Sequence, residues 1–155
     1  MIPALIDLGS SSPWPVLPPG IHDATLTEIG VRFATTPHRR RLFAGFEQVV
    51  AILTRAGCGT IYLDGSFVTD KPHPGDYDGC WELGGVDPHA LDPVLLRFDD
   101  KREEQKRKFY GEMFIASFPG APGKTFLELF QVEKYSGLPK GILRVRPPHS
   151  KGPGL

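Results

Sequence analysis

Residues 60–83 constrain the fold most strongly, because they predict two strands joined by a turn. Residues 60–63, Thr-Ile-Tyr-Leu, favour a short strand that ends at Gly65-Ser66. After nine intervening residues, Asp76-Tyr77-Asp78 begins a second predicted strand. Side chains at positions i and i+2 of a strand point to the same face, about 7 Å apart, so we expect Asp76 and Asp78 to project together. The sequence therefore predicts two carboxylates on one surface, next to a glycine-serine turn.

This pattern suggests a metal site beside a phosphate site. Two carboxylates can share Mg²⁺ or Mn²⁺, which prefer oxygen ligands. The backbone N–H groups of Gly65-Ser66 could hold a phosphate, and Lys71, in the loop that follows, could reach one as a point charge. A solvated loop lysine is the alternative for Lys71.

Glu128 is the expected third carboxylate of the metal site. It interrupts the apolar run Phe126–Phe130 of a predicted strand. An isolated acid there is destabilising unless it is paired or bound to a metal. A salt bridge to a basic residue is the open alternative.

Composition and length indicate a single globular domain. The chain has 155 residues, and its 18 basic and 18 acidic side chains cancel, so net charge does not predict nucleic-acid binding. Cys58 and Cys80 are too few for a disulfide framework and match no zinc motif, which favours buried thiols in a reducing cytoplasm. No apolar run approaches the ~18 residues of a membrane helix, so we expect a cytoplasmic protein without a membrane partner.

Caps, chain breakers and periodicity predict an α/β (α+β) domain, a small mixed β-sheet with helices packed on it. We expect an extended Pro-rich lead-in over residues 1–20, the domain over 21–146 and a disordered tail over 147–155. The predicted helices cover residues 25–33, 36–56, 88–98 (two short ones) and 99–108. Besides the two strands above, further strands are predicted at 112–118, 125–132 and 141–145.

Three consecutive arginines, Arg39, Arg40 and Arg41, lie in the first turn of the second predicted helix. Cations at that end oppose the helix dipole. Either an acidic partner, a phosphate or RNA favours them, or they form a solvated face with one arginine paired to a nearby acid. We prefer the solvated face.

The motif of residues 65–78 resembles the signature of the polymerase-β-type nucleotidyltransferase superfamily, a Gly-Ser turn after one strand and Asp-x-Asp on the next. The wider chain is similar to an uncharacterised, mostly bacterial, nucleotidyltransferase-like family. The segments that carry this similarity are 17–20, 37–41, 63–69, 74–78, 92–96, 130–131 and 140–142. The resemblance implies a nucleotidyltransferase-type fold.

The resemblance also implies an activity. Asp76 and Asp78 would hold Mg²⁺, Glu128 would take the place of the third carboxylate, and Gly65 and Ser66 would contact the triphosphate of a nucleotide such as ATP. The expected function is transfer of a nucleotidyl group to a protein, tRNA or small-molecule acceptor, within a toxin-antitoxin system in one reading. The alternative is a catalytically inactive module that binds a partner protein such as a toxin, as an antitoxin does.

Overall fold

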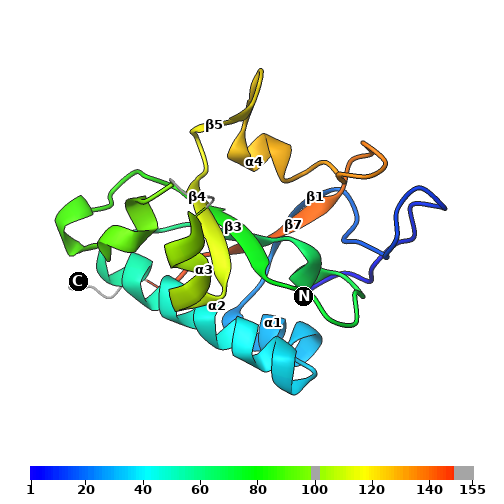
Figure 1. The fold of residues 1–155 in the computed structure, drawn as a ribbon, viewed down its shortest axis with the longest axis horizontal. Coiled ribbons are helices and arrows are strands. Elements are labelled where there is room, and N and C mark those ends of the chain that lie inside the picture. Colours follow the sequence, from blue (N-terminus) through cyan, green and yellow to red (C-terminus); the bar gives the residue numbers. More distant parts are fainter. Residues whose placement is uncertain (99–101, 149–155) are drawn as a thin grey trace.

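A five-stranded mixed sheet forms the centre of the domain (Figure 1). The computed structural model describes residues 1–98 and 102–148. Across the sheet the strands are β1 (Gly20–Asp23), β7 (Gly141–Val145), β2 (Ile61–Asp64), β3 (Tyr77–Trp81) and β4 (Gly111–Ile115). β1 pairs with β7 and β3 pairs with β4 in parallel, whereas β2 is antiparallel to β7 and to β3. This arrangement confirms the predicted α/β class with a small mixed sheet.

Helices α1 (Leu26–Phe33), α2 (Pro37–Arg55) and α3 (Glu103–Phe109) cover one face of this sheet (Figure 1). The main hydrophobic core lies between them and the sheet, and it joins Phe33, Phe46 and Phe109 of the helices to Leu63, Trp81 and Met113 of the strands. Since alternate residues of a strand share a face, the intervening strand residues point to the opposite side.

That opposite side is covered by α4 (Phe126–Leu129), which follows a small hairpin of β5 (Pro119–Ala121) and β6 (Lys124–Thr125). A second core forms there from Tyr62, Cys80, Phe114, Phe126 and Phe130, among others. The rings of Phe114 and Phe126 stack with their centroids 4.2 Å apart. α4 thus covers only part of the second sheet face, and other residues occupy the rest of that face.

The helix starts follow the caps that the sequence predicts. Thr25 and Glu28 form a capping box at the start of α1, and the hydroxyl of Thr36 accepts a hydrogen bond from the backbone N–H of Arg39 in α2. Such caps satisfy N–H groups that have no partner inside the helix. The two short helices near residue 90 are 3-10 turns, η2 (Pro88–Ala90) and η3 (Pro93–Leu96).

Two features of the fold differ from the prediction. The expected strand over residues 125–132 is wrong, because Thr125 caps the short helix α4 instead. β1 was not predicted at all. It begins at the last residue of the expected lead-in, and the lead-in itself packs against the domain through buried Ile2, Val16 and Leu17.

Several other predictions concern the segments outside the described residues, the cysteines and membrane-spanning helices. Of the expected tail, residues 149–155 lie outside the described residues, as do 99–101 of the expected charged helix. Cys58 and Cys80 are buried free thiols, as expected. Within the described part of the chain, no helix combines the length and the apolar character that crossing a membrane requires.

Candidate metal centre

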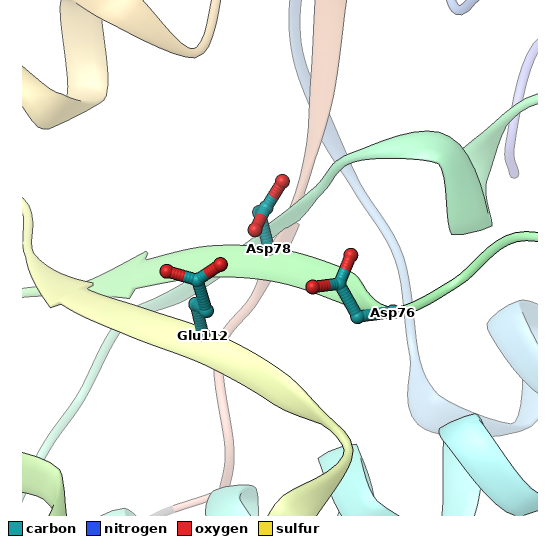
Figure 2. Close-up of side chains that lie close together, drawn as sticks. All are labelled: Asp76, Asp78 and Glu112. Carbon is teal, nitrogen blue, oxygen red and sulfur yellow. The ribbon is translucent and has the colours of Figure 1, made fainter. Parts of the chain in front are cut away.

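Three carboxylates gather on the part of the second sheet face that α4 does not cover. Asp76, Asp78 and Glu112 each offer an oxygen atom, and these oxygens all lie within 4.8 Å of one another (Figure 2). Each of the three side chains is partly buried. The expected pairing of Asp76 with Asp78 is present, and the acid that joins them is Glu112.

Backbone geometry explains this gathering. Asp76 immediately precedes β3 and Asp78 is the second residue of that strand, so their side chains project to one side. β4 runs parallel to β3, and Asp78 stands directly across from Glu112 in the register. Side chains opposite each other on neighbouring strands lie on the same face. The third carboxylate therefore comes from a neighbouring strand, as expected for such a site, but from a different residue.

Glu128, the predicted third carboxylate, lies outside this group. It is exposed on α4, and its Oε1 accepts hydrogen bonds from the Thr125 backbone N–H at 2.9 Å and the Thr125 hydroxyl at 3.2 Å. The backbone hydrogen bond from Thr125 is the main cause that lowers the pKa of Glu128. The physical reason for the correction is the capping box, since Thr-x-x-Glu satisfies helix N–H groups and removes any need for a metal.

The carboxylates repel one another strongly. Burial, together with the negative charges of Asp76, Asp64 and Glu112, raises the pKa of Asp78 to about 8. Burial, followed by the charge of Glu112, also raises the pKa of Asp76. Asp64 adds to this field because it stands opposite Asp78 on β2, where it is buried and paired with the Lys140 ammonium. A cation bound among these oxygens would relieve the repulsion.

The donor set fits a hard divalent cation. Oxygen-only ligands from one to three carboxylates suit Mg²⁺ or Mn²⁺, which usually keep several waters or substrate oxygens as further ligands. Glu112 also contacts two cations of the protein, Arg102 through its Nε and Lys106 with its Nζ 3.2 Å from Oε1. These ion pairs balance part of the charge of Glu112 and compete with a metal for its oxygens.

Gly65 lies directly against Asp78, which places the predicted phosphate turn beside the carboxylates. Its φ of 88° lies in the left-handed region. A Cβ at this position would stand 2.9 Å from the Asp78 backbone nitrogen and 3.0 Å from its Oδ2. Ser66 begins the short 3-10 helix η1 (Ser66–Val68) that follows. Only glycine satisfies both the backbone angle and the close approach.

We expect Gly65→Ala to lower the free energy of unfolding by about 1–3 kcal/mol, because it strains the turn and pushes against Asp78. The displaced Asp78 should also weaken Mg²⁺ binding. Urea unfolding and titration calorimetry measure the two effects. Gly75→Ala is the matched control, since a Cβ on Gly75 meets nothing within 4 Å. Equal behaviour of the two variants would contradict the role of Gly65.

Lys71 lies in the middle of the loop that joins β2 to β3. Burial and Glu112 raise the pKa of Asp76, and the positive charges of Lys106, Lys134 and Lys71 offset part of that rise. The Lys71 carbonyl, together with those of Phe67 and Thr69, accepts hydrogen bonds from the guanidinium of Arg39. The loop is thus held in place, with the Lys71 side chain in the electrostatic field of the carboxylates.

The preferred interpretation of the three arginines, a solvated face, is wrong for Arg39. It is buried rather than part of a solvated face, and it binds carbonyl oxygens rather than an acid. Arg40 and Arg41, its neighbours, are exposed. The cluster therefore divides into one residue that holds the loop and two on the surface.

Sequence comparison gives this chain a family. The model of the DUF6932 family, a family of unknown function, matches residues 11–146. The chain belongs to this family. The DUF6932 match includes all five strands of the central sheet and all three carboxylates. Among curated proteins and solved structures, no significant match to the chain is found.

Proposed function

We propose that this protein is a Mg²⁺-dependent nucleotidyltransferase. The observation that supports the proposal most is the set of three carboxylates on β3 and β4, directly beside the turn at Gly65. The carboxylate group includes Asp76 and Asp78, the two acids of the sequence motif that resembles nucleotidyltransferases. The third acid is Glu112 in place of Glu128.

In this proposal Asp76, Asp78 and Glu112 hold Mg²⁺ or Mn²⁺. The metal, when bound, supplies positive charge that orients and neutralises phosphate oxygens. Gly65 and Ser66 bind the triphosphate through backbone N–H groups. The oxygen of an acceptor hydroxyl would bond to the α-phosphorus, and the bond from that phosphorus to the bridging oxygen would break. Pyrophosphate would leave, and the hydroxyl proton would pass to water.

The protein's own contribution is position and charge. The sheet fixes the three carboxylates, and Arg39 holds the backbone of the loop that carries Ser66 and Lys71. Lys71 contributes a positive charge for the phosphates. Positioning of reactants and electrostatic stabilisation can supply most of the rate acceleration in phosphoryl and nucleotidyl transfer. The acceptor is a protein, a tRNA or a small molecule.

Label transfer from nucleoside triphosphates tests this proposal. The protein is incubated with Mg²⁺, each of the four triphosphates labelled at the α-phosphate, and the protein, RNA and small-molecule fractions of a cell lysate. We expect label to enter one fraction. Asp76→Asn, Asp78→Asn and Glu112→Gln should each reduce transfer at least about 100-fold, since each removes a ligand of the site. Glu128→Gln is the matched control and should retain activity. Equal activity in the Glu112 variant and the wild type would contradict the site.

The second candidate function is an inactive module that binds a partner protein such as a toxin. The observation that favours it is the pairing of Glu112 with Arg102 and Lys106, which satisfies this carboxylate without a metal. No label in any fraction, together with no binding of Mg²⁺, would support this alternative over catalysis.

A further inference from the structure

Of the three carboxylates in Figure 2, Glu112 alone forms ion pairs within the described part of the chain. Its Oε2 contacts Arg102 Nε, and its Oε1 lies 3.2 Å from Lys106 Nζ. Both oxygens of Glu112 are therefore in contact with positively charged groups. A divalent cation on either oxygen would stand next to one of these charges, and like charges repel. The two ion pairs and a bound metal are thus alternatives for Glu112.

The two cations reach Glu112 from the start of α3. Arg102 immediately precedes this helix and Lys106 follows four residues later, a spacing that places two side chains on the same helix face. The Arg102 guanidinium also lies over the Phe114 ring, 4.9 Å from its centroid. Phe114 is two residues beyond Glu112 on β4, so Arg102 covers two neighbouring side chains on one face of that strand.

Arg102 holds this position with a strained backbone. Its φ of 58° lies in the left-handed region, which only Tyr110 shares among the described residues other than glycine. A residue with a side chain keeps such a conformation only where its surroundings stabilise it. The contacts with Glu112 and Phe114 supply that stabilisation for Arg102. Loss of the ion pair would therefore favour relaxation of the backbone at Arg102.

α3 does not depend on these ion pairs for its place beside the sheet. The side-chain oxygen of fully buried Gln105 accepts a hydrogen bond from the backbone N–H of Met113 at 2.8 Å. At the end of the helix, the carbonyl of Phe109 accepts one from the Tyr77 hydroxyl at 2.9 Å. These contacts tie α3 to β4 and β3. The two cations can thus leave the carboxylate while the helix stays in place.

We propose that Arg102 and Lys106 are an intrinsic competitor of the metal, which holds Glu112 in the metal-free protein and leaves it when a divalent cation binds. This inference rests on the proposed function and adds how occupancy of the same site is regulated. The free energy of breaking the two ion pairs is subtracted from that of metal binding, so the ion binds more weakly than the three carboxylates alone would bind it.

Titration calorimetry with Mg²⁺ and with Mn²⁺ tests the competition by its sign. Arg102→Met should bind the ion about 10-fold more tightly than the wild type, and Lys106→Met about 3-fold more tightly, since the Lys106 pair is more exposed. Lys108→Met is the matched control. It also removes a positive charge from α3, but Lys108 pairs with Asp92, so the affinity should change by less than about 2-fold. Weaker binding by the Arg102 and Lys106 variants would show that these cations position Glu112 for the metal instead.

Nitrogen-15 NMR of the wild type follows Arg102 directly and does not depend on whether a variant folds. As Mg²⁺ is added, the signal of the Arg102 Nε–H should shift, and this proton should exchange faster with water because it loses its carboxylate acceptor. Arg102→Lys identifies the signal. The Arg144 Nε–H, which donates to Asp23 Oδ1 at 2.7 Å, is the matched control and should keep its exchange rate.

The failures are distinguishable. If the wild type binds Mg²⁺ and both variants bind it no more tightly, the competitor role is wrong while the proposed function stands. Unchanged exchange of the Arg102 Nε–H in the metal-bound wild type would have the same meaning. Binding of the ion by Arg102→Met and not by the wild type would support the inference. If the wild type and both variants bind neither Mg²⁺ nor Mn²⁺, both the proposed function and the inference are overturned.

Discussion

Replacing Asp78 with asparagine is expected to make the metal-free protein more stable at pH 8 and to remove its response to Mg²⁺. The cause is the pKa of Asp78, which burial and the neighbouring acids raise to about 8 from an ordinary value of 3.8. Between these two values the folded chain keeps a proton that the unfolded chain releases. Folding stability from this group is therefore present below about pH 4 and declines as the pH rises to about 8, by up to about 1.4 kcal/mol per pH unit.

Asparagine has the same shape and does not titrate, so the variant lacks this decline. Urea unfolding at pH 5, 6, 7 and 8 in EDTA should show the variant gaining on the wild type as the pH rises. Added Mg²⁺ should stabilise the wild type, by about 2.7 kcal/mol at 100 times its dissociation constant, and leave the variant unchanged. A stability difference between variant and wild type that stays constant with pH would show that the pKa of Asp78 is not raised. An equal response of both proteins to Mg²⁺ would show that Asp78 is not a metal ligand.

Arg39→Ala is expected to destabilise the protein by about 3–5 kcal/mol. The buried guanidinium donates to the carbonyl oxygens of Phe33, Phe67, Thr69 and Lys71, at 3.2, 2.7, 2.9 and 2.6 Å. Its loss leaves these acceptors without their partner in a buried region. It also frees the loop that carries Ser66 and Lys71.

Urea unfolding measures this effect, and two further variants sharpen it. Arg39→Lys should recover only part of the loss, because an ammonium cannot reproduce the planar fork that spans several carbonyls. Arg40→Ala, at the exposed neighbouring position, should change the free energy of unfolding by less than about 0.5 kcal/mol. Similar losses in the Arg39 and Arg40 variants would mean that the arginine cluster acts through its overall charge instead.

Local signals in the sequence predicted the helices well. Thr25 and Thr36 cap α1 and α2 as expected, because a cap and its first turn involve residues that are close together in the chain. The same kind of signal is present at Thr125, where a strand is predicted instead. Its capping box lies within an apolar run, and apolar runs of that length suit a strand and a buried helix equally.

Long-range pairing accounts for what the sequence did not reveal. β1 exists as a strand because Gly20–Asp23 pairs with Gly141–Arg144, more than a hundred residues away. Glu112 joins the site for a similar reason: its strand was predicted, but its position opposite Asp78 depends on the parallel pairing of β4 with β3. The acid at the start of an otherwise apolar strand was the available signal for Glu112. The Asp76 and Asp78 pair needed no such pairing, since two residues of one strand share a face wherever that strand lies.

Direct binding of a divalent cation tests the central claim, that Asp76, Asp78 and Glu112 form a metal site. Titration calorimetry with Mg²⁺ and with Mn²⁺ compares the wild type with Asp76→Asn, Glu112→Gln and Glu128→Gln. We predict that the wild type and the Glu128 variant bind the ion with equal affinity, and that the Asp76 and Glu112 variants lose at least about 10-fold, as the removal of a charged ligand implies. Undiminished binding by Glu112→Gln, or a loss confined to Glu128→Gln, would contradict the site described by the structure.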